Sequence, residues 1–335
     1  MRNSLRVILV LLSVGLSSLA VTAQEANAPK TDAQVPPSLA TAPQVQPQTP
    51  SAVAIAEFDP RADAAYGAYQ RGFYLTAFDL ALERAKSGDA AAQTLIAELY
   101  DKGLGIALDP KEAAAWYGLA ADAGNPDAQF AYAIKLIEGN HVKKDLAKAR
   151  TYLKKAADAG LVVADFNLAQ MIVDASGGQA GFAEAYPYYL KAAQGNVADA
   201  MYAMAQIYGE GLGVEKDDAK AFEWMAKAAR AGIDTAQVEL GIWLANGRGT
   251  AKDEKAAFGW IQRAARGGNA IAQNRLAKMY ALGIGTEREK SEAGKWHIIA
   301  QRAGLDDPWL NEFIARMEPA EREKALAEAN RWPQG

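Results

Sequence analysis

The sequence contains no cysteine and only two histidines, and these absences exclude several kinds of site. Without cysteine there is no disulfide framework, no thiolate metal ligand and no cysteine nucleophile. The two histidines are His141 and His297, too far apart in sequence to form the i, i+4 pair of a helical zinc site. No serine lies in a G-x-S-x-G or S-x-x-K motif. We therefore expect no catalytic, cofactor or metal site, and no enzyme.

An excess of basic residues is also missing. The chain has 36 lysines and arginines against 40 acidic residues, which gives a formal net charge of −4. Proteins that bind nucleic acid neutralise phosphates with clustered lysine and arginine. The balance of charge therefore predicts no nucleic-acid partner.

Residues 1–23 have the pattern of a secretory signal peptide. Two arginines precede the apolar stretch 7–16, which is too short to be a good membrane span, and the small residues 21–23 suit a cleavage site. We expect the mature chain to begin at Gln24, to span no membrane and to reach a bacterial periplasm or the medium. An uncleaved N-terminal anchor is the alternative interpretation.

Residues 24–57 contain no aromatic residue and six prolines. Such a segment buries too little apolar surface to offset the entropy lost on ordering. The composition predicts a disordered linker, with the folded part beginning near Phe58.

The rest of the chain is built from copies of one unit, for which residues 200–232 serve as the example. Apolar residues at helical spacing predict two helices separated by a loop. Gly211 is placed to end the first helix in a left-handed conformation, and Asp217 is placed to cap the second. Trp224 lies on the apolar side of the second helix, where we expect it to fill the gap between alanine-lined helices.

The same residue types return every 36 residues. The first helix has a small residue at Ala92, Ala128, Ala164, Ala200, Ala236 and Ala272. The second helix has a large aromatic residue at Trp116, Tyr152, Tyr188, Trp224, Trp260 and Trp296. The loop has a glycine at Gly103, Gly139, Gly211, Gly247 and Gly283. A fixed period of this length predicts stacked helix pairs, because one pair alone leaves its apolar side exposed.

This pattern, A-x-x-x-[LM]-A…Y-x-x-G-x-G-x-x-x-D…A-x-x-W-[YM]-x-x-A-A-x-x-G, resembles the Sel1-like repeat family, relatives of the tetratricopeptide repeat. The resemblance covers roughly residues 89–304. It implies an all-α fold, an α/α solenoid forming a right-handed superhelix, that is used for protein–protein contacts. We expect about seven helix pairs in residues 58–304, followed by capping helices in residues 305–335.

Several positions depart from the pattern. The first pair, residues 63–71 and 74–86, is degenerate, as terminal repeats commonly are. In the fourth pair Pro187 is expected to kink or delay the second helix, and the irregular stretch from Gly177 to Pro187 is either a tolerated weak repeat or a hinge.

Four further side chains are assigned from their positions in the chain. His141 is expected to be a solvated loop residue and His297 a packing residue. Trp309 and Trp332 are expected to cover the last exposed helix pair.

The first helices of stacked pairs usually line the concave face, and one register of them is aromatic at its centre. Phe130, Phe166 and Tyr202 occupy equivalent positions, and Gln170 and Gln206 lie four residues beyond two of them. An aromatic stripe flanked by amides is suited to binding a peptide or a helix of a partner. The alternative is that these aromatic side chains are partly buried in the core.

The combined prediction is an exported interaction scaffold that binds a protein partner, possibly an envelope protein, on its concave face. Similar periplasmic members of the Sel1-like family include inhibitors of sensor kinases, so the resemblance suggests by analogy that this protein regulates an envelope process or sensor. Two alternatives stay open. One is an enzyme or binder directed at cell-wall fragments, and the other is a structural spacer of the envelope.

Overall fold

The structure is a computed structural model, and it describes residues 64–332. The expected signal peptide, the proline-rich linker and the expected start of the fold near Phe58 lie outside the described residues.

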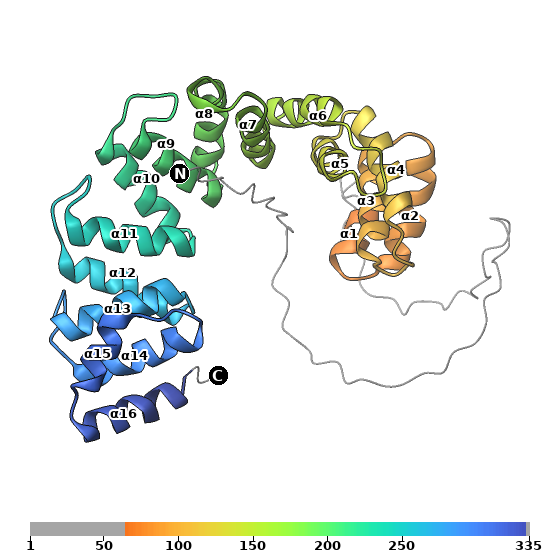
Figure 1. The fold of residues 1–335 in the computed structure, drawn as a ribbon. Helices are drawn as coiled ribbons and strands as arrows, with labels where there is room; N and C mark the ends of the chain where they lie inside the picture. The colour runs from red at the N-terminus through yellow and green to blue at the C-terminus, as the bar shows by residue number, and fades with distance from the viewer. Residues whose placement is uncertain (1–63, 333–335) are drawn as a thin grey trace, which may run out of the picture. The chain divides into compact units, whose positions relative to one another are not determined.

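The described residues form sixteen α-helices and no β-strand, and the helices follow one another in chain order (Figure 1). The first eight are α1 (Ala64–Gln70), α2 (Tyr74–Lys86), α3 (Ala90–Lys102), α4 (Pro110–Asp122), α5 (Pro126–Glu138), α6 (Leu146–Asp158), α7 (Val162–Ser176) and α8 (Gly178–Gln194). The others are α9 (Ala198–Glu210), α10 (Asp218–Arg230), α11 (Asp234–Asn246), α12 (Glu254–Arg266), α13 (Ala270–Leu282), α14 (Lys290–Arg302), α15 (Pro308–Ala315) and α16 (Pro319–Asn330).

Each helix from α2 to α13 packs on the helix before it and the helix after it. This nearest-neighbour packing confirms the predicted α/α solenoid. We call α3, α5, α7, α9, α11 and α13 the A helices of the six regular pairs, and α4, α6, α8, α10, α12 and α14 their B helices. Helix α2 is the B helix of the first pair. None of the described helices combines the length and apolar character needed to cross a membrane.

The repeated alanines form the contacts between helices. Ala200 of α9 and Ala221 of α10 are fully buried, and so are their equivalents in the other five pairs, with at most 1% of their surface exposed. An alanine at a helix contact lets two backbones approach closely without leaving a void. The prediction that the small residues mark the packing sides of the helices is confirmed.

The helix ends are formed as the sequence predicts. Gly211 ends α9 with φ of 68°, in the left-handed region that glycine adopts without strain. The Asp217 side chain accepts a hydrogen bond from the backbone N–H of Lys220 at 3.0 Å and so caps α10. Equivalent aspartates cap α4, α6 and α12.

In four loops the second glycine has a separate role, because it lies against the B helix of the preceding pair. A Cβ atom added to Gly249 would lie 2.0 Å from the carbonyl oxygen of Asp218, at the start of α10. Gly285 has the same relation to Glu254 of α12, also at 2.0 Å. His141 occupies this position in the third pair, with φ of 62° and an exposed side chain, which agrees with its expected place in a solvated loop.

A buried glutamine links each of four A helices to the preceding B helix. Its side-chain amide donates to a carbonyl oxygen eight residues earlier, near the end of that B helix, from Gln93 to Ala85, Gln129 to Ala121, Gln237 to Ala229 and Gln273 to Ala265. In the fourth pair Asp165 stands at the glutamine position, and the Lys191 ammonium donates to the equivalent carbonyl of Ala157 at 2.7 Å. Each of these carbonyls also accepts from the backbone N–H three residues later, so the side-chain donor adds a second hydrogen bond that joins two consecutive helices.

The expectation that the large aromatic of the B helix fills the core is wrong for most copies. Trp116, Tyr188, Trp224 and Trp260 are only half-buried, and the Lys227 ammonium lies 3.9 Å from the ring centroid of Trp224. The following residue is the core residue in all six pairs, at Tyr117, Leu153, Tyr189, Met225, Ile261 and His297. The reason is rotational, since consecutive residues are turned by about 100° around a helix.

Pro187 does not delay its helix. The helix α8 begins at Gly178, earlier in its repeat than the other B helices, and continues through Pro187 to Gln194. The proline lies on the exposed side, where water can satisfy the carbonyl group that loses its N–H partner. The predicted delay is therefore wrong.

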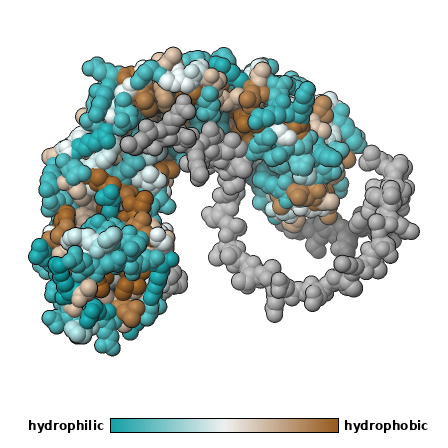
Figure 2. All heavy atoms as spheres, viewed as in Figure 1, coloured by the Kyte–Doolittle hydropathy of each residue, from teal (hydrophilic) through white to brown (hydrophobic). Residues whose placement is uncertain are grey.

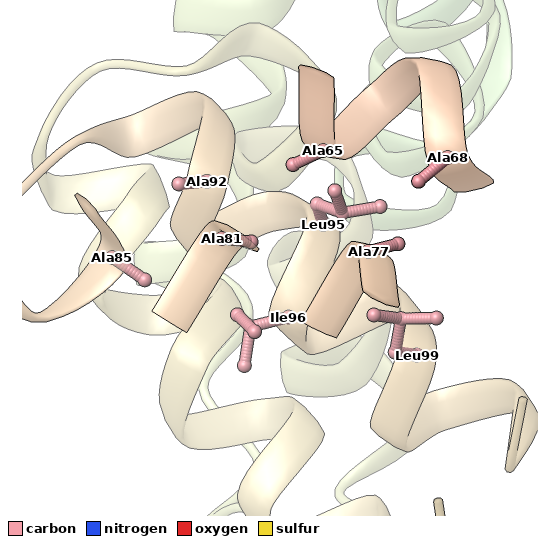
Figure 3. Close-up of a cluster of buried hydrophobic side chains, with 9 residues drawn as sticks. All are labelled: Ala65, Ala68, Ala77, Ala81, Ala85, Ala92, Leu95, Ile96 and Leu99. Atoms are coloured by element: carbon pink, nitrogen blue, oxygen red, sulfur yellow. The ribbon is translucent and has the colours of Figure 1, made fainter. Parts of the chain in front are cut away.

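The first pair is a short version of the repeat, as predicted. Helices α1 and α2 pack against α3 through a small cluster of buried side chains (Figure 3). The cluster consists of Ala65, Ala68, Ala77, Ala81, Ala85, Ala92, Leu95, Ile96 and Leu99. Leu80, at the position of the B-helix aromatic, is 45% exposed.

The C-terminal helices close the other end of the row. Helix α16 packs on α14, and Gly294 leaves room there for Ala325. The indole of Trp332 lies edge-on to Trp296, with ring centroids 5.0 Å apart. Trp309 instead stacks on Phe313 and is 43% exposed, so of the two tryptophans expected to cover the last pair only Trp332 does so.

The burial pattern predicts that Met225→Ala is more damaging than Trp224→Ala. Met225 is fully buried, so its truncation should lower the free energy of unfolding by about 2–5 kcal/mol. The half-buried Trp224 should lose less than about 2 kcal/mol, because much of its surface is already in water. Urea denaturation followed by circular dichroism measures both. A larger loss of unfolding free energy for Trp224→Ala than for Met225→Ala would show that Trp224, and not Met225, is the core residue.

The loop contacts predict opposite effects for two glycine-to-alanine substitutions. Gly249→Ala should destabilise the protein by more than about 2 kcal/mol, because the new methyl group meets the backbone of α10 and φ is positive. Gly259→Ala is the control, since Gly259 lies inside α12 with no atom within 4 Å of an added Cβ. It should stabilise the helix by about 0.5–1 kcal/mol. Equal effects in thermal denaturation would contradict this account of the loops.

Candidate interaction surface

The predicted aromatic stripe is not continuous on the surface. Phe130 and Tyr202 are half-buried, whereas Phe166 between them is only 4% exposed. The Phe166 ring packs edge-on against Tyr189 of α8, with centroids 5.9 Å apart. Phe166 therefore contributes to the core and offers almost no surface, while Gln170 and Gln206, one turn further along their helices, are half-buried and reachable.

Tyr202 and Gln206 are held together by a residue that sequence analysis missed. The Tyr202 hydroxyl donates to Glu239 of α11 at 2.8 Å, and the Gln206 amide donates to the other oxygen of the same carboxylate at 3.2 Å. Burial, followed by the hydrogen bond to Glu239, raises the pKa of Tyr202 far above its usual range, so the hydroxyl stays protonated and remains a donor. Glu239 directly follows Val238, which lies 36 residues after Tyr202, so the position of Glu239 in the repeat was the available signal.

The middle of the A-helix side also carries acidic groups without basic partners. Asp174 of α7 and Asp199 of α9 form no ion pair with any residue in 64–332, and neither does Glu239. Burial raises the pKa of Asp174 and of Asp199 above the ordinary value. Gln170 has no hydrogen-bond partner among the same residues. We call Gln170, Asp174, Tyr202, Gln206 and Glu239 the central surface.

The ends of the A-helix side are occupied by contacts within the chain. Glu98 of α3 accepts from both Tyr69 and Lys102. At the other end Lys278 of α13 pairs with Asp307. The stripe register therefore has uncommitted polar groups only near its centre.

The two histidines lie far from this surface and take no part in it. His297 is 1% exposed, and its Nε2 atom lies 2.7 Å from the side-chain oxygen of Asn311, which agrees with its expected packing role. Within residues 64–332 no three histidine, cysteine, aspartate or glutamate side chains are arranged to hold a metal ion. The space-filling view shows a mostly hydrophilic surface interrupted by separate apolar patches (Figure 2).

Comparison with known families accounts for this architecture. Six consecutive segments match the model of the Sel1 repeat, at residues 90–125, 126–161, 162–197, 198–233, 235–269 and 270–305. The chain belongs to the Sel1 repeat family. The matched segments begin with the A helices and include all six regular pairs, whereas α1, α2, α15 and α16 lie outside them.

Two solved structures show the same fold. A Sel1 repeat protein from Oxalobacter formigenes is 32% identical, with a TM-score of 0.61, over 71% of this chain and 98% of that chain. The second is c5321, a protective antigen of uropathogenic Escherichia coli with an SLR fold. It is 25% identical, with a TM-score of 0.65, over 80% of this chain and 60% of that chain. No protein of curated function matches the chain.

Membership of this family has a general functional meaning. Sel1 repeat proteins are generally scaffolds for protein–protein interaction, which fits a row of helices whose contacts are made mainly with their neighbours. Family membership does not say which side of the row is used. The side used for binding is instead inferred from the geometry of the central surface.

The ion pair between Lys278 of α13 and Asp307, which caps α15, predicts that the stability of the protein depends on pH in the acidic range. Burial of Asp307 opposes ionisation, but Lys278, the backbone N–H of Leu310 and the Asn274 amide together lower its pKa from the ordinary 3.8 to about 2. A lowered pKa means that this stabilisation is complete above about pH 4 and is lost as the pH falls through about 2.

In urea denaturation, Asp307→Asn should therefore lose less free energy of unfolding between about pH 4 and pH 2 than the unmodified protein does. Asp234→Asn, which removes an exposed carboxylate in the first turn of α11, is the control and should keep the full acid dependence. Identical acid dependence in the Asp307 variant and the unmodified protein would contradict the assignment.

Proposed function

We propose that this Sel1 repeat protein is an exported scaffold that binds a protein partner through the central surface. The observation that carries the proposal is the group of polar side chains on α7, α9 and α11 that form no ion pair with a described residue. Gln170 and Asp174 have no partner among the described residues, and the Tyr202–Gln206–Glu239 cluster presents a carboxylate already fixed in position. Rigid, partly exposed polar and aromatic groups of this kind suit a protein interface.

The charge of the central surface indicates the chemistry of the partner. The two carboxylates of this surface, those of Asp174 and Glu239, lie on the A helices and form no ion pair with a described residue. A partner segment with lysine or arginine residues would complement this charge, and complementary charge raises both the association rate and the specificity. We therefore propose a basic segment of a protein, presented as an extended peptide or a helix.

Export is proposed from the N-terminal sequence. Residues 1–23 have the charged, apolar and small-residue regions of a signal peptide, and cleavage would leave Gln24 at the start of the mature chain. Such a chain would meet its partner in the periplasm or outside the cell. An envelope protein, such as a sensor under regulation, is the proposed partner.

Photo-crosslinking in intact cells tests the proposal. A photoreactive amino acid at position 170 should yield a protein adduct that the same group at position 223 does not, because Glu223 is exposed on the B helix α10. Asp174→Lys should abolish the adduct by reversing the charge, whereas Glu223→Lys, a matched change on the other side, should not. Mass spectrometry of the same samples should show a mature chain that starts at Gln24.

Two results would contradict the proposal. No protein adduct at position 170 would remove the central surface as a binding site. The same adduct from positions 170 and 223 would show contact without selectivity for the A-helix side. Circular dichroism of both lysine variants verifies that the fold is intact before the comparison is made.

A further inference from the structure

A second site lies at the C-terminal end of the row, on the B-helix side. A cleft of about 510 Å³ opens between α12, the end of α13 and α14, and Trp332 closes one side of it. We call it the end cleft. Its volume is in the range of small-molecule sites, roughly 300–1,000 Å³. None of the residues of the central surface lines it.

The one acidic group in the end cleft is already neutralised by its neighbours. The Lys295 ammonium donates to Glu292 at 3.1 Å, and the indole N–H of Trp296 donates to Glu292 at 3.0 Å. This carboxylate therefore has two donors and offers little to a positively charged ligand. The lining residues carry two positive charges, from Arg266 and Lys295, and one negative charge, which leaves the cleft positive in a chain of net charge −4.

Two hydrogen-bond donors in the end cleft remain uncommitted. Arg266 forms no ion pair or hydrogen bond with any described residue, and its side chain is exposed. Tyr280 accepts a hydrogen bond from the Gln262 amide at 3.4 Å, so its own O–H is free to donate. Burial raises the pKa of Tyr280, which keeps that proton in place at neutral pH.

The preceding repeat shows that the fold does not require these side chains. Thirty-six residues earlier, Arg230 and Trp260 match Arg266 and Trp296. The other positions are small or apolar there, with Ala226, Leu244, Ala256 and Gly259 in place of Gln262, Tyr280, Glu292 and Lys295. The stacked helices form equally well in both repeats, so packing does not require Gln262, Glu292 or Lys295. The Tyr280 ring does have a packing role, because it lies against Phe258 as Tyr100 lies against Phe78.

We propose that the end cleft binds a small organic anion, a carboxylate or phosphate group carried on a flat apolar body. Arg266 would pair with the oxyanion through two parallel N–H groups, and the Tyr280 hydroxyl would donate to the same group. The ring of Trp332, half-buried and held edge-on against Trp296, provides the apolar wall for the body of the ligand. This proposal does not depend on the protein-binding function of the central surface.

Three probes of similar size test the charge requirement. N-acetylphenylalanine carries a carboxylate, phenyl phosphate carries a phosphate, and N-acetylphenylalaninamide is neutral. Isothermal titration calorimetry on the purified full chain should give at least about tenfold tighter binding for one or both anions than for the amide. Tight binding of only one anion identifies the source of the oxyanion, and tight binding of both shows that the oxyanion itself is recognised.

Substitutions then locate the site. Arg266→Ala should weaken binding of the anion by about tenfold, and Tyr280→Phe should weaken it severalfold while keeping the ring that packs on Phe258. Arg230→Ala is the matched control, since it removes the equivalent arginine one repeat earlier, and it should leave binding unchanged. Thermal denaturation establishes that all three variants are folded.

Three outcomes would overturn the proposal. These are the absence of binding by any probe at millimolar concentration, equal binding of the amide and the anions, and equal losses in the Arg266 and Arg230 variants. None of these outcomes bears on the crosslinking experiment at position 170, so the two proposals fail separately.

Discussion

The close approach of helices at their alanines is the contact on which the rest of the structure depends. Ala200 and Ala221 are fully buried, as are their equivalents in the other five regular pairs. A larger side chain there would push neighbouring backbones apart, and core packing tolerates such an increase poorly. Because each helix contacts mainly its neighbours, a fault in spacing at one pair would pass directly to the next.

Once the alanines set the spacing, the loops and helix ends complete the stack with backbone contacts. Gly249 and Gly285 let each loop rest on the first turn of an earlier B helix. Four buried glutamines bond to carbonyl groups near the ends of preceding B helices. These contacts use the backbone, so they allow the exposed side chains of each repeat to vary without loss of the fold. That freedom is what lets one repeat differ from another in function.

The repeats therefore serve as internal references for one another. A side chain present in every copy is explained by packing, as Ala200 is, whereas one present in a single copy needs another reason. The Tyr202–Glu239 bond is of the second kind. Arg266 and Tyr280 have counterparts in other repeats, at Arg230 and at Tyr100 and Tyr208, but only the last regular pair combines them with Glu292 and Lys295. The two surfaces lie on different sides of the helix row and differ in charge, which fits one acidic site for a protein and one basic site for a small anion.

The sequence by itself determined the period, the helix pairs, the capping aspartates and the left-handed glycines, because each depends on local residue type and spacing. Tertiary structure decided which side of each helix is buried. Trp224 was expected in the core, yet its neighbour Met225 fills it, and Phe166 belongs to the core although its equivalent Tyr202 is half-exposed. Adjacent residues differ by about 100° in direction, and the apolar side of a helix is at least about that wide. Two neighbouring apolar residues can therefore both fit the pattern, although only one of them points into the core. Glu239 and the end cleft depend on contacts between residues on different helices, which only the stacked structure brings together.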